Sequence, residues 1–95
     1  MYTISSQLYD CTARNLLEAV DGRNYFSGSV DFNFGDIECR LTASLIIYRS
    51  KRSLPEGDVD VISDIVPVWW EFHTSNAEDE MLNDFSFGDL KRYLL

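Results

Sequence analysis

The sequence predicts an α+β fold, an antiparallel meander of three strands, or four if Met81–Asn83 adds one, with both terminal helices packed on one face. Three observations lead to this fold class. Apolar residues recur at spacings of three and four near the start of the chain, alternate with polar residues in the middle, and return to helical spacing at the end. The expected order is helix, strand, strand, strand, helix, and 95 residues suit a single domain at 1–95.

The first helix is expected from Ser5 to Asp21. Its apolar face would consist of Leu8, Tyr9, Ala13, Leu16, Leu17 and Val20. Ser5 or Ser6 can cap the first turn with a hydroxyl. Gly22 can adopt the left-handed conformation that ends a helix.

A β-hairpin is expected next, because residues 25–34 and 37–48 both alternate between apolar and polar side chains. Only Gly35-Asp36 separates them, and a glycine at the first central position fits a type II′ turn. That turn pairs Phe34 with Ile37, Phe32 with Cys39, Asp31 with Arg40, Gly28 with Ala43 and Tyr25 with Ile46. The opposite-charge pair supports this register, and the glycine–alanine pair predicts that a helix passes closest at that point.

The third strand is expected to begin at Asp58, after a loop at Arg49–Gly57 whose last four residues fit a type I turn. Its alternation slips near Ile62–Asp64, which indicates a bulge. Pro67 lacks an N–H group, so the strand should lie at a sheet edge or have its proline at the bulge. The inward side chains are then Val66, Val68, Trp70 and Phe72, and the outward ones are Pro67, Trp69, Glu71 and His73.

The C-terminal part is expected to form a surface turn at Thr74–Glu80, the optional strand, and a helix. Ser86 is placed to cap that helix, with Asp89 as its capping-box partner and Phe85 packed onto Leu90. Its apolar face comprises Phe87, Leu90 and Leu94.

This order of elements resembles that of double-stranded-RNA-binding domains. That family carries a basic cluster at the start of its second helix, whereas here Asp84 and Asp89 flank Ser86 and only Lys91 and Arg92 follow. The resemblance is therefore limited to the order of elements, and we expect no RNA-binding function.

The net charge and the first residues of the chain limit the expected binding partners and the expected location. Sixteen acidic residues against 8 basic ones give a formal net charge of −8, which repels phosphate backbones and anionic membranes, so direct binding to nucleic acid or membrane is not expected. The first residues resemble no signal peptide, which favours the cytoplasm. Cys11 and Cys39 are expected to be buried free thiols.

Large apolar side chains on the outward phase of the strands are the main candidate site. They are Tyr25, Ile46, Tyr48 and Trp69. Such groups on an open sheet face are typical of a contact surface, unless a terminal segment or the long loop covers them. Glu71 and His73 share the phase of Trp69 and complete the set of protein-interaction candidates.

Three other groups of residues are weaker candidates for a functional site. Glu71 beside His73 could form an acid–base pair, but no nucleophile motif accompanies it, and no catalytic residue is assigned. Arg49, Lys51 and Arg52 share the expected loop and are either an anion-binding group or solvated charges. Asp58 and its acidic neighbours lack the glycine and glutamate of a calcium loop, so neither metal nor cofactor is expected.

The sequence thus favours a small non-enzymatic module that binds a protein partner or a second copy of itself through its aromatic sheet face. One alternative is an acidic inhibitor that mimics nucleic acid in the basic groove of a partner protein. The other is a small enzyme that uses His73.

Overall fold

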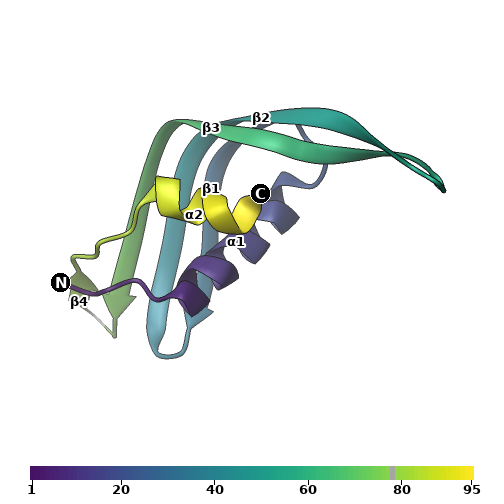
Figure 1. Cartoon of the computed structure of the whole chain (residues 1–95). Coiled ribbons are helices and arrows are strands. Elements are labelled where there is room, and N and C mark those ends of the chain that lie inside the picture. Colours follow the sequence, from purple (N-terminus) through teal and green to yellow (C-terminus); the bar gives the residue numbers. More distant parts are fainter. Residues whose placement is uncertain (78) are drawn as a thin grey trace.

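The computed structural model describes residues 1–77 and 79–95 and contains two helices and four strands. Their bounds are Ser6–Val20 (α1), Tyr25–Phe34 (β1), Ile37–Leu54 (β2), Gly57–Asn76 (β3), Asp79–Met81 (β4) and Phe87–Leu94 (α2). The strands form one antiparallel sheet in the order β1-β2-β3-β4, and both helices lie on one face of it (Figure 1). The predicted α+β meander is confirmed, including its fourth strand. No helix in these two ranges is long and apolar enough to cross a membrane.

Helix α1 begins and ends within a residue of the predicted positions. The Ser5 hydroxyl accepts a hydrogen bond from the Leu8 N–H at 3.2 Å, which satisfies one donor of the first turn. At the other end Asp21 and Gly22 have φ angles of 42° and 79°, so the chain leaves the helix through the left-handed region. Leu8 and Leu16 are completely buried on the face that packs against the sheet.

The β1–β2 hairpin has the predicted register at every pair, including Asp31 opposite Arg40 and Gly28 opposite Ala43. Gly35 has a φ of 59°. A positive φ at the first central position of a two-residue turn is the requirement of type II′, and glycine meets it without strain.

Phe26, rather than a helix, fills the space over Gly28. A Cβ placed on Gly28 would lie 3.7 Å from the Phe26 Cζ atom, which is its nearest neighbour outside the adjacent residues. The expectation that a helix passes closest there is therefore wrong. Residues two apart on a strand share a face, so the Phe26 ring can cover the glycine from the same strand.

Strands β2 and β3 continue as a two-stranded arm where a loop was predicted at Arg49–Gly57. Only Pro55 and Glu56 separate the strands, so the turn itself lies where the sequence placed it. Cross-strand polar contacts take the place of an apolar face here: Lys51 lies opposite Asp60, and the Ser53 hydroxyl donates to Asp58 Oδ1 at 3.0 Å. We call Arg49–Leu54 together with Gly57–Ile62 the arm.

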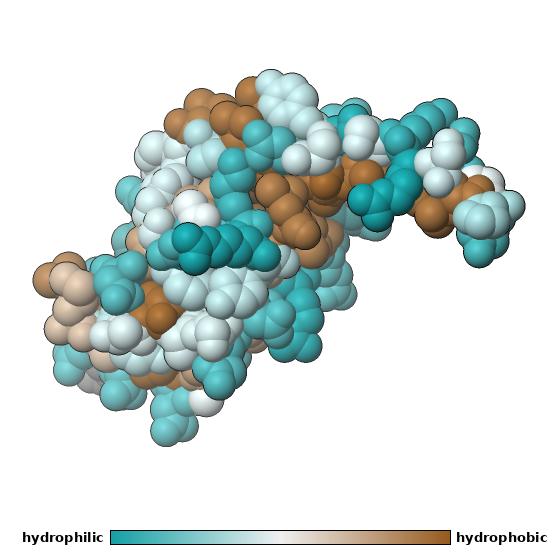
Figure 2. All heavy atoms as spheres, viewed as in Figure 1, coloured by the Kyte–Doolittle hydropathy of each residue, from teal (hydrophilic) through white to brown (hydrophobic). Residues whose placement is uncertain are grey.

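The arm projects beyond the helices and gives the molecule an elongated shape of 50 × 24 × 19 Å (Figure 1). Every side chain from 51 to 60 is exposed. Figure 2 shows the arm standing away from the body with hydrophilic and hydrophobic atoms interspersed.

Two bulges in β3 set which side chains face the helices. One lies at Ser63, within the segment where the sequence predicted it, and the other at Val68, beside Pro67. The extra residue at Val68 reverses the alternation, so Ile65 is completely buried, whereas Val66 and Val68 are 38% and 65% exposed. The predicted inward facing of these two valines is therefore wrong, and Pro67, opposite the buried Leu45, is not outward.

β4 and its surroundings differ from the predicted surface turn at Thr74–Glu80. β3 continues to Asn76 and β4 begins at Asp79, two residues before the predicted strand, while the acidic Glu78 lies outside the described residues. Thr74 is completely buried, and its hydroxyl is satisfied there because it donates to the Met81 carbonyl at 3.0 Å. The N-terminal segment joins this edge through a parallel bridge between Tyr2 and Asn83.

An aromatic cluster joins α2 to the sheet. Phe85 stacks on Phe72 with ring centroids 4.1 Å apart and meets Trp70 edge-on at 5.5 Å. Ser86 occupies the predicted N-cap position, but its hydroxyl makes no capping bond, and its N–H donates to the Tyr9 hydroxyl at 3.1 Å.

Gly28→Leu should destabilise the fold by about 1–3 kcal/mol, because the larger side chain must displace the Phe26 ring. Urea denaturation would measure the change in the free energy of unfolding. Asn33→Leu, on the exposed face of the same strand, is the matched control. Equal stability of the two variants would contradict the packing described here.

Trp70→Ala should lower the free energy of unfolding by about 3 kcal/mol, because it removes a half-buried ring from the contact with Phe85. Its neighbour Trp69 is 48% exposed and points to the other face, so Trp69→Ala should change stability by less than about 0.5 kcal/mol. Circular dichroism during chemical unfolding compares the two variants, and the reverse order of stability would show that the facing of β3 is inverted.

Candidate functional site

The outer face of the sheet, opposite the helices, carries a row of large side chains across three strands. Tyr25 lies opposite Ile46, and Ile46 lies opposite Val66. They are 55%, 36% and 38% exposed. Neighbouring positions across a sheet bring side chains on one face within contact distance, so this row forms a continuous apolar strip.

Trp69 and Tyr48 extend the strip along the strands. Trp69 lies opposite Ser44, and Tyr48 lies opposite Asp64. Both aromatic side chains are about half exposed. We call Tyr25, Ile46, Tyr48, Val66 and Trp69 the outer aromatic patch. The four members named from the sequence are exposed as expected, so neither the terminal segments nor the arm covers them.

Val66 is the member that the alternation missed. The sequence pattern assigned it to the inward phase because the bulge at Val68 was not anticipated. Pro67 was the available signal, since a proline inside a strand is typical of an edge or a bulge. A prediction with a second bulge at Val68, in addition to the one near Ser63, would have assigned Val66 to the outer face.

Polar pairs form a ladder on the same face, next to the patch. The Ser27 and Ser44 hydroxyls are 3.0 Å apart, and those of Ser29 and Thr42 are 2.8 Å apart. These short side chains project little from the middle of the outer face, and their hydroxyl groups satisfy each other by hydrogen bonds across the strands. The patch is therefore bordered by a polar zone.

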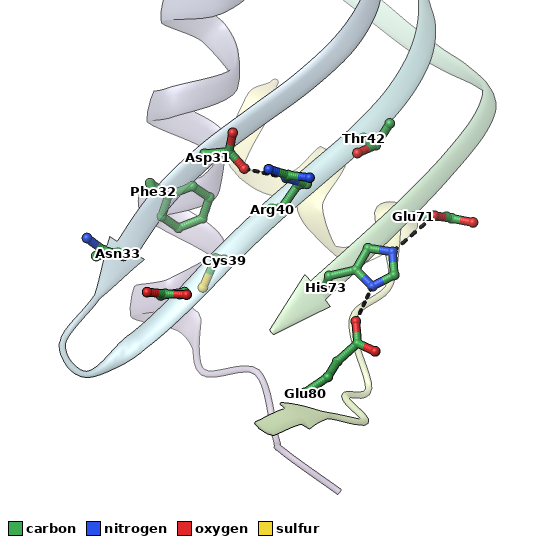
Figure 3. Close-up of a pocket in the computed structure, with 10 residues that line it drawn as sticks. Asp31, Phe32, Asn33, Cys39, Arg40, Thr42, Glu71, His73 and Glu80 are labelled. Carbon is green, nitrogen blue, oxygen red and sulfur yellow. Dashed lines mark hydrogen bonds and ion pairs between the residues drawn. The ribbon is translucent and has the colours of Figure 1, made fainter. Parts of the chain in front are cut away.

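His73 lies beyond this ladder in a shallow hollow of about 660 Å³ (Figure 3). Its Nε2 is 3.0 Å from Glu71 Oε2, and its Nδ1 is 2.6 Å from Glu80 Oε1. Hydrogen bonds to Glu71 and then to Glu80 raise the pKa of His73 above its usual range, because both carboxylates favour the imidazolium. Glu71 was expected beside His73, whereas Glu80 comes from β4 and was missed.

The basic side chain opposite His73 is already ion-paired. Arg40 lies opposite His73 in the sheet, but its Nε donates to Asp31 Oδ1 at 2.6 Å, so its charge is largely balanced. Both imidazole nitrogens are occupied by carboxylates, which suits a protonated ring that ties β4 to β3. It does not suit a general base, which needs a free nitrogen directed at a substrate.

Cys39 borders the hollow but cannot act with His73. The two residues lie next to each other in register yet on opposite faces of the sheet, and the Cys39 side chain is buried. Burial raises the pKa of the Cys39 thiol to about 11, so it stays protonated at neutral pH. Among the residues that the structure describes, no group of three His, Cys, Asp or Glu side chains could hold a metal ion.

The basic residues predicted to share a loop lie instead on a strand of the arm. Arg49 donates to the Asn24 side-chain oxygen at 3.2 Å and to the Arg23 carbonyl at 3.0 Å, which fixes it against the end of α1. Alternation along β2 places Lys51 on the same face as Arg49 and Arg52 on the opposite face. The three charges therefore do not converge on one anion.

Comparison with protein-family models, curated proteins and solved structures finds no match to this chain. The geometry of the outer face is the basis for the function proposed below.

His73 should contribute stability at low pH that disappears as the pH rises. Its pKa is raised in the folded protein, so the contribution is complete below the pKa of the unfolded chain, about 6.5, and is lost through the higher folded value. Because the side chain is half exposed, the contribution should stay below about 1 kcal/mol.

An NMR titration of the single histidine measures this pKa directly. Glu80→Gln should lower the measured pKa, because it removes the closer carboxylate, whereas Glu56→Gln in the distant turn of the arm should not. A wild-type pKa at or below about 6.5 would contradict the geometry.

Proposed function

We propose that this chain is a non-enzymatic protein-interaction module that binds its partner through the outer aromatic patch. The observation that supports this most is the row Tyr25–Ile46–Val66, with Trp69 and Tyr48 beside it, on the sheet face opposite the helices. Soluble proteins rarely leave contiguous apolar surface of this kind uncovered.

The composition of the patch fits an interface centre. Tyrosine and tryptophan supply large contact area with little side-chain entropy to lose, and they are enriched among residues that dominate binding energy. The serine and threonine pairs beside the patch and the Asp31–Arg40 ion pair would form part of the polar rim that usually surrounds such a centre.

The partner is either another protein or a second copy of this chain. A homodimer would bring together two chains of formal charge −8, so its long-range electrostatics are repulsive and screened by salt. Self-association through the patch should therefore strengthen as ionic strength rises, whereas binding of a basic partner should weaken.

The two alternatives from the sequence have less support. An acidic mimic of nucleic acid needs carboxylates in a row, but those of the described residues are scattered over both helices, all four strands, and the Gly35-Asp36 and Pro55-Glu56 turns. Several of them, such as Asp10, Asp31 and Asp64, are already ion-paired. A hydrolytic site at His73 has neither a free imidazole nitrogen nor an accessible thiol.

The cytoplasm is the location we propose for this module. The two cysteines are free, which fits a reducing compartment; Cys39 is buried as expected, whereas Cys11 is only partly buried.

Trp69→Ala should leave the fold intact and weaken binding by about tenfold or more, because it removes the largest ring of the patch. Leu82→Ala, which removes an exposed apolar side chain outside the patch, is the matched control. Light scattering over a range of protein and salt concentrations measures self-association, and affinity capture with both variants measures other partners.

A wild-type chain that is monomeric at every concentration and captures nothing that Trp69→Ala fails to capture would exclude the patch as a binding surface. Equal loss in Leu82→Ala would assign the effect to non-specific hydrophobic contact.

A further inference from the structure

Both edges of the arm lack a strand partner. β1 pairs with β2 only as far as Ile46, and the last backbone hydrogen bond on that side runs from the Ile47 N–H to the Asn24 carbonyl at 2.9 Å. On the other side β4 pairs with β3 only at Thr74–Asn76. Within residues 1–77 and 79–95, no strand therefore continues the sheet beside the arm.

The direction of the free backbone groups follows from Ile47. Its N–H points toward the β1 side, and the N–H and C=O groups of a strand alternate between its two sides. Arg49, Lys51 and Ser53 must then direct their backbone donors and acceptors to the same open side. Their spacing of about 6.6 Å is that of a strand ready to pair.

The two edges of the arm differ in charge and not in protection. Neither Arg49–Leu54 on β2 nor Gly57–Ile62 on β3 contains a proline or a bulge. Pro67 and the bulges at Ser63 and Val68, which hinder strand addition, lie on β3 outside the arm. The side chains that flank each edge therefore decide which strand it can accept.

The charges of the arm are separated between its strands. Arg49, Lys51 and Arg52 lie on β2, whereas Glu56 lies in the turn and Asp58 and Asp60 lie on β3. The arm and its turn together hold three basic and three acidic residues and are neutral within a chain of formal charge −8, whereas the open β2 edge is locally basic. An acidic segment would be attracted to this edge on either face, by Lys51 on one and Arg52 on the other.

A second copy of the chain does not fit the same edge by symmetric pairing. A two-fold axis would place the β2 edge against itself, and the basic side chains would then oppose each other. The charge pattern favours a different chain with acidic residues.

We propose that the β2 edge of the arm, Arg49–Leu54, is a second binding site that accepts an extended acidic segment of a partner protein as an added β-strand. Main-chain hydrogen bonds to Arg49, Lys51 and Ser53 provide affinity, and the basic side chains select the acidic sequence. This site is distinct from the outer aromatic patch. The added strand would lie in line with β1 and turn the two-stranded arm into a three-stranded sheet, which is more stable in water.

A fluorescein-labelled decapeptide of alternating threonine and glutamate is the test probe, with the threonine–lysine decapeptide for comparison. Fluorescence anisotropy at low salt should show saturable binding of the glutamate peptide and binding of the lysine peptide weaker by about tenfold or more. Absent binding, or equal binding of both peptides, would overturn the proposal.

Two pairs of variants test the edge itself. Ser53→Pro removes a backbone donor at the open side and should weaken binding by about tenfold or more, whereas Ser53→Ala loses only the hydroxyl bond to Asp58 and should bind within about twofold of wild type. Arg52→Glu should weaken binding, whereas Arg14→Glu on α1, with the same change in net charge, should not. Equal behaviour within either pair would overturn the proposal.

Trp69→Ala separates this site from the outer aromatic patch. It should leave peptide binding unchanged, because Trp69 lies outside the arm. Peptide binding that is lost in Trp69→Ala and kept in Ser53→Pro would overturn the edge site while leaving the patch in place. If Trp69→Ala has no effect in the association assay, the proposal for the outer aromatic patch is wrong, but the peptide-binding result still supports the edge site.

Discussion

The bulge at Val68 is the constraint on which the rest of the sheet depends. One extra residue in β3 reverses the facing of the strand, so Ile65 is buried beneath the helices while Val66 joins Ile46 and Tyr25 on the outer face. Together with the second bulge at Ser63, it lets β2 and β3 bend over α2 and continue as the arm (Figure 1). The Asp64–Lys91 ion pair, 2.8 Å long, joins β3 to α2 at this bend.

Much of the fold could be predicted because local rules determine it. The Gly35-Asp36 turn sets the β1–β2 register, and helical spacing with Ser5 and Gly22 delimits α1. The arm could not be predicted from alternation. Its strands bury no side chain between 51 and 60, so they lack the apolar face that marks a strand, and they form because β2 and β3 are already paired below.

The candidate sites also combine features that local sequence determines with features that long-range strand pairing determines. The outward facing of Tyr25, Ile46, Tyr48 and Trp69 follows from strand phase, which the sequence carries. Val66 and Glu80 depend on longer-range facts: where the extra residue of β3 sits, and which later strand pairs with Thr74–Asn76. No pattern within β3 alone reveals that His73 has a carboxylate on each ring nitrogen.

The exposed arm and the outer aromatic patch present the same physical problem. Each leaves binding capacity unused, as unpaired backbone groups in one case and uncovered rings in the other. Tyr48 belongs to the patch and immediately precedes the arm, so the two surfaces are continuous. A strand added beside Ser50–Ser53 would begin next to Tyr48, and a body attached to that strand could cover the patch. One partner could then use both surfaces, with the edge selecting charge and the patch supplying apolar contact area.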